Sequence, residues 1–365
     1  MENTKNLFKK AYEAGLTNKK ANLDVWLEKY GINTIILNKI FNTENLNNIF
    51  NRNKEIENIA QFIGTQERQK RFSLINVIGV NGIGKTTLLK LIHGSYAELN
   101  PSKKTLFLNA DDFSKLDEED QEEEFYFEKI LSNIGDKRVI FIDDCDKDFL
   151  HMADNLKALS SYNLTLILAW RPIHWNKFKI ENQENIDLDE PIIINSFDNK
   201  ESLSFIDKVF TLIKKKNSKK LPFSNDALNS LVELSKGIPK IILDVYIKSL
   251  KRCFQFNNDT IKPEDVQSVF SEESYNAVTE FLENCTPITK KILRVLVLKS
   301  TKQGVSIDAI SEEVDLDRTS VFYHLQKMRS VSILNEYYLK KTVMFSIKEN
   351  FISFVDYYLW EGRKT

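Results

Sequence analysis

The pattern of apolar and polar positions divides the chain into regions of different predicted structure. Short, uninterrupted apolar runs recur through the first two hundred residues, and each is typical of a strand buried on both faces. Between and after them, apolar residues recur every three or four positions, which predicts amphipathic helices. The predicted strands are residues 74–78, 105–108, 139–142 and 164–169, with 192–194 as the last candidate.

The segments that immediately precede and follow this strand-containing region are predicted to contain only helices. Residues 1–48 alternate amphipathic stretches with Asn-rich breaks, and we interpret them as a helical segment that packs on the next domain. Residues 200–272 show helical spacing throughout. Within them, Gly237 is suited to end one helix and Pro239 to begin the next.

A third pattern begins near residue 288, where three amphipathic helices precede two β-like runs, 333–339 and 343–347. Ser306 and Asp317 stand where they would cap the second and third helices. Three helices followed by a hairpin are the order of a winged helix-turn-helix. On the third helix, the side chains predicted to face inward are Val321, Phe322, Leu325 and Met328.

Composition and charge limit the classes of function. The formal net charge is −1, so the chain as a whole lacks the basic character of a nucleic-acid-binding protein, and a DNA-binding surface must be local. No apolar stretch is long enough to span a bilayer, and the N-terminus has no apolar secretory segment. The 3 cysteines are scattered, which argues against a disulfide framework or a zinc site. We therefore expect a cytoplasmic protein.

The strongest motif follows the predicted strand at 74–78. Gly79–Thr86 fits the phosphate-binding loop G-x-x-x-x-G-K-[ST] at every fixed position, and helical spacing follows it. Its glycines let backbone N–H groups point at a polyphosphate. Lys85 is expected to reach the β and γ phosphates, and the Thr86 hydroxyl to bind Mg²⁺. The alternative, a turn that binds nothing, is disfavoured by this context. The expected nucleotide-binding residues are Gly79, Asn81, Gly82, Ile83, Gly84, Lys85, Thr86 and Thr87.

Two carboxylates end the predicted strand at 139–142. Open parallel sheets bind ligands at the carboxyl ends of their strands, so Asp143 and Asp144 are candidates for the catalytic acids. We assign Asp143 to Mg²⁺, directly or through water, and Asp144 to polarising the attacking water.

Arg171 follows the predicted strand at 164–169 and should therefore project from another strand end. The fork of donors on an arginine suits a γ-phosphate. The alternative is a surface salt bridge. The order of the elements favours the γ-phosphate sensor, and Arg171 joins Lys85, Asp143 and Asp144 as a residue expected to act in hydrolysis.

The outward face of the third C-terminal helix is polar and basic, and the hairpin carries a lysine pair. Such groups can meet phosphates and base edges of duplex DNA. The alternative is a winged helix used for packing or for gating the nucleotide. The candidate DNA-binding residues are Arg318, Thr319, Ser320, Tyr323, Lys327 and Arg329 on the helix, with His324 beside them, and Lys340 and Lys341 on the wing.

In their order along the chain, these motifs resemble those of the STAND and archaeal-type P-loop ATPases, which neighbour the replication-initiator ATPases of the AAA+ class. The tail 344–354 resembles the segment that closes the winged helix in archaeal-type members. The other segments that carry the resemblance are Phe50-Asn51-Arg52-Asn53-Lys54-Glu55-Ile56, Gly79–Thr86, Ile142-Asp143-Asp144, Arg171 and Gly237-Ile238-Pro239.

The resemblance implies an α/β P-loop NTPase fold, with a five-stranded parallel sheet covered by helices on both faces, a helical lid and a C-terminal winged helix. The implied domains are an N-terminal helical segment at 1–48, the ATPase core at 49–199, the lid at 200–272 and the winged-helix domain at 273–365.

For the site, the resemblance implies ATP with Mg²⁺, since no N-K-x-D motif is present to read guanine. It adds Arg52 and Pro239 to the nucleotide-binding residues, with Pro239 near the adenine and Arg171 near the γ-phosphate. Members of the family usually have a glutamate where this chain has Asp144, and the shorter side chain leaves the rate of hydrolysis open.

The leading hypothesis is an ATPase that acts as a Mg²⁺-ATP-dependent switch with slow or partner-stimulated hydrolysis. ATP would draw the lid and the winged helix onto the core, and hydrolysis would release them, changing the exposure of a surface for double-stranded DNA. The alternative is a STAND-type signalling or scaffold ATPase whose winged helix gates the nucleotide, with a protein as its partner. A third hypothesis, a ring-forming motor, lacks an assignable arginine finger, and the oligomeric state stays open.

Overall fold

The computed structural model describes residues 27, 30–33, 52–69, 71–102, 105–110, 138–146, 152–184, 186, 188–214, 222–256, 258–299 and 304–361. Most of the predicted N-terminal segment 1–48 and the first two residues of the motif at 50–56 lie outside these residues. The chain forms two compact units: residues 1–51 with 197–272, and residues 52–196 with 273–365.

A parallel sheet is the centre of the larger unit. Among the described residues it has five strands in the order β2-β3-β4-β1-β5, and every neighbouring pair is parallel. This confirms the predicted α/β fold of a P-loop NTPase. Because β1 lies between β4 and β5, the loop after β1 lies beside the carboxyl end of β4. The strands are β1 (Ser73–Ile78), β2 (Thr105–Asn109), β3 (Arg138–Asp143), β4 (Leu164–Trp170) and β5 (Ile192–Ile193).

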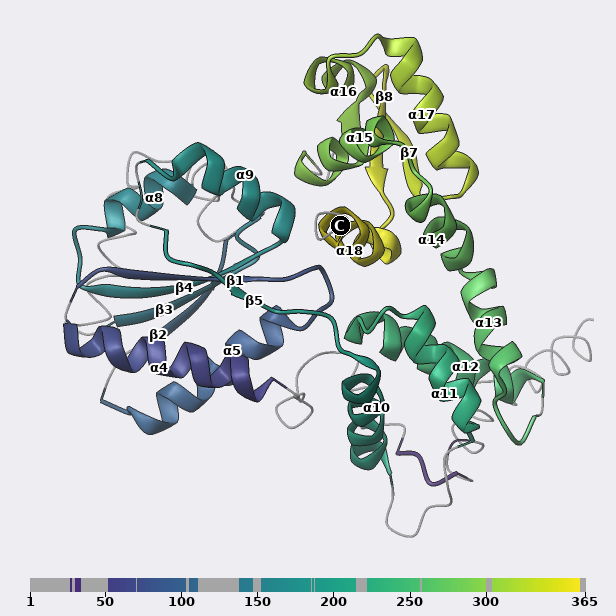
Figure 1. Cartoon of the computed structure of the whole chain (residues 1–365), viewed down its shortest axis with the longest axis horizontal. Helices are drawn as coiled ribbons and strands as arrows, with labels where there is room; N and C mark the ends of the chain where they lie inside the picture. Colours follow the sequence, from purple (N-terminus) through teal and green to yellow (C-terminus); the bar gives the residue numbers. More distant parts are fainter. Residues whose placement is uncertain are drawn as a thin grey trace, which may run out of the picture. The chain divides into compact units, whose positions relative to one another are not determined.

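Helices cover both faces of this sheet. α4 (Asn53–Gln69) and α5 (Lys85–Leu99) lie on one face, and α8 (Met152–Leu159) and α9 (Pro172–Asn182) on the other (Figure 1). Every residue of β1 and β4 is buried, as expected for a sheet packed on both sides. The predicted uninterrupted apolar runs are therefore the two-sided core of the domain.

The core between the sheet and α9 contains a cluster of aromatic rings. Trp170, the last residue of β4, packs on Phe178 with ring centroids 4.8 Å apart, and Trp175 lies 6.0 Å from Trp170. The indole nitrogen of Trp170 donates to Asn76 Oδ1 at 2.9 Å, which satisfies a polar group inside the sheet. These contacts fix the end of β4 and with it the position of the next residue, Arg171.

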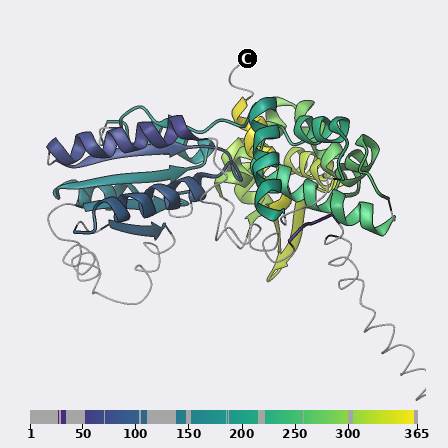
Figure 2. The same cartoon turned by 90° about the horizontal axis from the view of Figure 1, so that it is seen from below.

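The C-terminal part of the larger unit, from α14 onward, contains the predicted order of three helices and a hairpin. A short strand that the sequence did not predict, β6, pairs with β8, so the described strands form an antiparallel sheet in the order β6-β8-β7. Figure 2 shows the β7–β8 hairpin in yellow. The elements are α14 (Tyr275–Glu283), α15 (Pro287–Leu298), β6 (Val305–Ser306), α16 (Ile307–Val314), α17 (Arg318–Ser330), β7 (Leu334–Leu339), β8 (Thr342–Ile347), the 3₁₀ helix η1 (Glu349–Phe351) and α18 (Ile352–Glu361). We call α15 to α18 the C-terminal module.

Local signals predicted the helix ends of this module correctly. Ser306 accepts a hydrogen bond from the Ala309 N–H at the start of α16, and Asp317 accepts one from the Ser320 N–H at the start of α17. Phe322 is a correction, because its side chain is 46% exposed rather than turned inward.

The smaller unit contains α10 (Asn199–Ile213), α11 (Asn225–Leu234), α12 (Pro239–Gln255) and α13 (Pro263–Glu272). Gly237 has a φ of 68°, and a Cβ there would lie 2.0 Å from the Phe197 carbonyl oxygen, so a glycine is required where α11 gives way to α12. Pro239 occupies the first position of α12, as predicted. No helix of the described residues has both the length and the apolar character needed to cross a membrane.

Candidate nucleotide site

The loop Gly79–Thr86 joins β1 to α5. Gly82 and Gly84 have φ values of 78° and 101°, a conformation that side chains disfavour. At Gly79, a Cβ would lie 2.7 Å from Ile83 Cγ2 and 3.1 Å from the Ile194 carbonyl oxygen. These three glycines are therefore required by the shape of the loop itself, which closes tightly on the end of β1.

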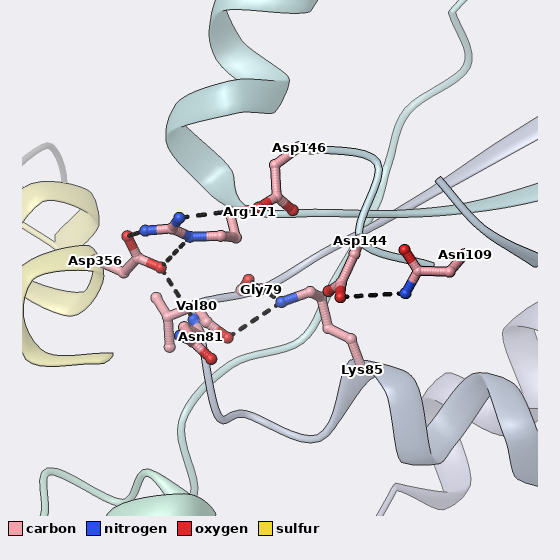
Figure 3. Close-up of polar contacts among 9 residues, drawn as sticks. All are labelled: Gly79, Val80, Asn81, Lys85, Asn109, Asp144, Asp146, Arg171 and Asp356. Atoms are coloured by element: carbon pink, nitrogen blue, oxygen red, sulfur yellow. Dashed lines mark hydrogen bonds and ion pairs between the residues drawn. The ribbon is translucent and has the colours of Figure 1, made fainter. Parts of the chain in front are cut away.

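Lys85 is the first residue of α5, and its side chain folds back over the loop. Its amine donates to the carbonyl oxygens of Gly79 at 2.8 Å and Val80 at 3.3 Å (Figure 3). Burial lowers the pKa of Lys85, although the nearby carboxylates of Asp146, Asp356 and Asp143 oppose that shift. The predicted phosphate-binding amine thus lies at the centre of an acidic cluster.

The residues predicted to hold Mg²⁺ lie together. Asp143 is the last residue of β3 and is 3% exposed. Burial raises the pKa of Asp143, and a hydrogen bond with the Thr86 side chain lowers it in turn. One oxygen, Asp143 Oδ1, is buried without a hydrogen-bond partner among the described residues. A buried free carboxylate oxygen beside a hydroxyl fits a Mg²⁺ ion, which prefers one or two protein oxygens together with nucleotide phosphates.

Among the described residues, no other metal centre competes with this interpretation. Within the part of the chain that the structure describes, no three His, Cys, Asp or Glu side chains gather closely enough to hold a metal ion by themselves. A Mg²⁺ ion at Thr86 and Asp143 would therefore depend on the phosphates of a bound nucleotide.

Asp144 follows β3 in the left-handed backbone region, with a φ of 53°. Its Oδ2 lies 3.4 Å from the side-chain nitrogen of Asn109, the last residue of β2. The second predicted catalytic acid is therefore oriented from the neighbouring strand, an interaction that the sequence did not indicate.

Arg171 follows the end of β4, as predicted, and forms an ion pair that the sequence did not indicate. Its Nε and Nη2 donate to the two carboxylate oxygens of Asp356 at 2.7 and 2.6 Å, and its Nη1 lies 3.8 Å from Asp146 Oδ2. Burial alone would lower the pKa of Arg171, but the Asp356 carboxylate outweighs it and raises the pKa above its usual value. With its side chain only 13% exposed, Arg171 forms a buried ion pair rather than a surface salt bridge.

Asp356 is a residue of this site that the sequence analysis did not identify. It lies on α18 and is fully buried, and its Oδ2 also accepts the backbone N–H of Asn81 at 3.1 Å (Figure 3). A signal was available, because Asp356 is a lone acid within the apolar run Phe351–Trp360, and buried acids are almost always paired. The partner could not be inferred from the sequence.

His174 is a further buried titratable group near Arg171 and Asp356. It lies on the first turn of α9, 2% exposed, and burial lowers its pKa to about 4. The charges that act on it include Asp146, Arg171 and Asp356. His174 is therefore neutral at physiological pH.

Two further residues predicted to bind the nucleotide come from outside the phosphate-binding loop. Arg52 is buried immediately before α4, with its Nη1 3.2 Å from Glu55 Oε1. Pro239 lies in the smaller unit, at the start of α12. Their contacts with a nucleotide stay predictions.

The predicted DNA-binding residues lie on α17 and on the turn between β7 and β8. Apart from Ser320, which is half-buried, and the neighbouring His324, all are exposed. His324 is also partly buried, and its Nδ1 lies 2.9 Å from the Thr289 hydroxyl oxygen, so it faces α15 rather than solvent alone. The exposed residues are Arg318, Thr319, Tyr323, Lys327, Arg329, Lys340 and Lys341.

Three of these cations already have partners. Arg318 Nε lies 3.0 Å from Asp308, and Arg329 Nη1 lies 3.0 Å from Glu336. The amine of Lys327 lies 4.3 Å from the centre of the Tyr323 ring. The three cations are exposed, so these interactions are weak, and a ligand can replace the present partners.

A glycine loop between a parallel strand and a helix, with a lysine, a threonine and a strand-end aspartate converging on it, defines the site of a P-loop NTPase. Residues 44–183 match the family model described as Novel STAND NTPase 5. The resemblance to STAND and archaeal-type P-loop ATPases is thereby confirmed over the segment that contains Arg52, Lys85, Asp143 and Arg171.

One solved structure supports the fold, and two others are similar at lower scores. The ORC1 protein of Aeropyrum pernix in complex with DNA aligns with a TM-score of 0.50 and 13% identity, covering 86% of this chain and 93% of that one. The A. pernix ORC2 protein in ADPNP–ADP complexes gives 0.48 and 11%, covering 86% and 95%. The Thermotoga maritima RuvB Holliday junction branch migration motor gives 0.41 and 13%, covering 82% and 92%. A comparison with curated proteins gave no match.

Proposed function

We propose that this chain is a Mg²⁺-ATP-dependent switch that hydrolyses ATP slowly or on stimulation by a partner. The observation that carries the proposal is the convergence of Lys85, Thr86 and Asp143 at the carboxyl end of the sheet, with one oxygen of Asp143 left without a hydrogen bond. Lys85 and Thr86 begin α5 and Asp143 ends β3, and titratable groups with shifted pKa values that gather at the carboxyl end of a parallel sheet are typical of functional sites.

Each residue has a stated role in this proposal. The backbone N–H groups of the loop and the amine of Lys85 bind the phosphates, and Thr86 with Asp143 holds Mg²⁺. When bound, the ion neutralises charge on the β and γ phosphates. Asp144, oriented by Asn109, polarises the attacking water. Arg171 contacts the γ-phosphate after its ion pair with Asp356 has broken.

The remaining nucleotide contacts are proposed from the family resemblance. By this resemblance Arg52 contacts the nucleotide and Pro239 is near the adenine. ATP rather than GTP is the proposed substrate because the sequence has no N-K-x-D motif to read guanine. The helices of residues 200–272 act as the lid.

Isothermal titration calorimetry with ATP and Mg²⁺ tests the central assignment. Lys85→Ala should abolish measurable ATP binding, because the amine supplies the only charge of the loop itself. Lys90→Ala is the matched control, since Lys90 is exposed on the same helix and should bind ATP as the wild type does. Unchanged affinity in Lys85→Ala would overturn the assignment.

We further propose that the C-terminal module is a winged helix whose α17 and β7–β8 turn contact double-stranded DNA. The exposed cations on α17 and the lysine pair on the turn support this. The relative with the same fold, A. pernix ORC1, was solved in complex with DNA. ATP turnover measured with and without duplex DNA tests the link, because a coupled switch should be stimulated or inhibited by DNA.

A second candidate is a signalling or scaffold ATPase whose module binds a protein. The exposed aromatic side chains of Phe322, Tyr323 and Tyr338, at 46%, 58% and 73%, favour it, because aromatic residues are enriched at protein interfaces. The salt dependence of binding separates the two candidates. Affinity for duplex DNA should fall steeply with salt, whereas an aromatic protein interface should be far less sensitive.

A further inference from the structure

Three aromatic side chains are exposed on neighbouring elements of the C-terminal module. Phe322 and Tyr323 on α17 are 46% and 58% exposed, and Tyr338 on β7 is 73% exposed. We call these three side chains the aromatic surface. An exposed ring forgoes the stabilisation that burial would give it, and rings that gather on one surface are typical of an interaction site.

The contact between α17 and β7 relates the positions of these rings. Arg329 Nη1 lies 3.0 Å from Glu336 Oε2, so these two residues mark where α17 faces β7. Phe322 precedes Arg329 by about two helical turns and lies along the same stripe of α17. Tyr338 is the next residue after Glu336 on the same face of β7. The junction of α17 and β7 therefore continues past the ion pair into exposed rings, toward the turn between β7 and β8.

Exposed lysines accompany these rings. The amine of Lys327 lies 4.3 Å from the centre of the Tyr323 ring, and Lys340 and Lys341 form the turn directly after β7. All three lysines are exposed. A protein interface would account for the rings, but such interfaces are depleted in lysine. Cations interleaved with exposed rings are instead typical of surfaces that bind single-stranded nucleic acid, where phosphates meet the cations and bases stack on the rings.

A closed duplex would leave these rings without a stacking partner. Each base face in a duplex is covered by the neighbouring base pair, so a side chain reaches it only at an end or where the helix is opened. A single strand presents its base faces, and stacking on an aromatic ring then adds to the affinity. The lysines serve both forms, because both carry phosphates. The rings, rather than the lysines, therefore discriminate unpaired from paired DNA.

We infer that the aromatic surface binds unpaired bases, so that the C-terminal module prefers single-stranded or locally opened DNA to a closed duplex. Tyr323 and Tyr338 stack on the bases, and the neighbouring lysines contact the phosphates. The inference rests on the proposed DNA contact of α17 and the β7–β8 turn, and it names the form of DNA that this contact selects. The preference is independent of base sequence, because every base has a face that can stack.

Fluorescence anisotropy of the full chain with three labelled probes tests this preference. The probes are an oligothymidylate, a strand of the same length made of abasic sites, and a duplex whose ends are closed by non-nucleotide linkers. The abasic strand keeps the phosphates and lacks the bases, so the oligothymidylate should bind at least about fivefold more tightly than it does. The oligothymidylate should also bind more tightly than the closed duplex, in which the base faces are covered.

Variants of the two tyrosines assign the preference to the aromatic surface. Tyr323→Ala with Tyr338→Ala should bind the oligothymidylate no more tightly than the abasic strand. Tyr323→Phe with Tyr338→Phe keeps both rings and should retain the preference. Tyr162→Ala removes a ring that is 41% exposed beside β4, and it should bind all probes as the wild type does. An oligothymidylate preference that is absent in the wild type, or unchanged in the double alanine variant, would overturn the inference.

Failure of the proposed DNA contact would give a different result. A chain that binds none of the three probes at low salt would contradict both that contact and this inference, and would favour a protein partner for the aromatic surface. A chain that binds the closed duplex as tightly as the oligothymidylate would retain the proposed contact and contradict the inference alone. Tighter binding to an oligouridylate than to the oligothymidylate would overturn the assignment to DNA.

Discussion

The side-chain nitrogen of Asn109 lies 3.4 Å from Asp144 Oδ2, and this hydrogen bond joins the carboxyl ends of β2 and β3. The two strands are neighbours in the sheet, where Asn109 pairs in register with Asp143. Asp144, at the position where the family resemblance led us to expect a glutamate, is therefore in contact with a neighbouring strand. This contact would orient the carboxylate that we propose to polarise the attacking water.

Asp144→Asn should lower ATP turnover by about 10²-fold or more while leaving ATP affinity nearly unchanged, because the amide cannot accept a proton from water. Steady-state phosphate release measures the turnover, and calorimetry measures the ATP affinity. Glu98→Gln, which neutralises an exposed acid on α5, should turn over ATP at the wild-type rate. Wild-type turnover in Asp144→Asn would exclude it as the acid that polarises water.

Thr86→Ala should make ATP binding insensitive to Mg²⁺. The Thr86 hydroxyl forms a hydrogen bond with Asp143. Without this hydroxyl, the Mg²⁺ ion would have one protein ligand fewer. We expect ATP affinity in Mg²⁺ to fall about tenfold or more, toward the value measured with a chelator. Thr65→Ala, on the exposed side of α4, should retain the full effect of Mg²⁺. A Thr86→Ala variant that still responds to Mg²⁺ as the wild type does would place the ion elsewhere.

The stability of the chain should decrease below neutral pH through His174. Its pKa is about 4 in the folded chain and 6.5 when unfolded, so the unfolded state binds the proton first as pH falls. The stabilisation is complete above pH 6.5 and is lost between pH 6.5 and about 4, amounting to at most about 3 kcal/mol.

His174→Gln provides the comparison for this prediction, because all other titrating groups are shared. In urea unfolding at a series of pH values, the difference in free energy of unfolding between wild type and variant should shrink as pH falls through that window. A difference that stays constant would show that His174 does not titrate on unfolding.

Gly237→Ala should destabilise the smaller unit by at least about 2 kcal/mol, because the new Cβ meets the Phe197 carbonyl oxygen and the backbone has a positive φ. Gly64→Ala is the matched control. No atom lies within 4 Å of a Cβ built there, and alanine in helix α4 should stabilise by about 0.5–1 kcal/mol. Urea unfolding of both variants measures the two effects, and a tolerated alanine at position 237 would contradict the described turn.

Replacing both Lys340 and Lys341 with alanine should weaken duplex DNA binding and lower the slope of log affinity against log salt by about 2, because each lysine would neutralise one phosphate. Lys157→Ala with Lys179→Ala removes the same charge from exposed sites on α8 and α9 and should leave the slope unchanged. Fluorescence anisotropy at several salt concentrations gives both slopes. Equal slopes in the wild type and both double variants would show that the wing is not part of a DNA interface.

Much of this fold follows from local signals. The phosphate-binding loop could be predicted because each step depends on neighbours in the chain: the apolar run of β1, the glycines at positive φ and the helix start at Lys85. The caps at Ser306 and Asp317 are local for the same reason. Phe322 was predicted wrongly because the buried stripe of α17 follows Val321, Leu325 and Met328, and the next residue lies about 100° further round the helix.

The sequence by itself determined the class of site, since a contiguous motif creates the phosphate-binding loop and an apolar strand delivers Asp143 to its tip. Only the tertiary structure decided what those groups touch without a ligand. Arg171 and Asp356 are 185 positions apart, and Asn81 and Asp356 are 275 apart. No periodicity or spacing encodes such a pair, because it exists only where α18 packs against the sheet domain and excludes water from both charges.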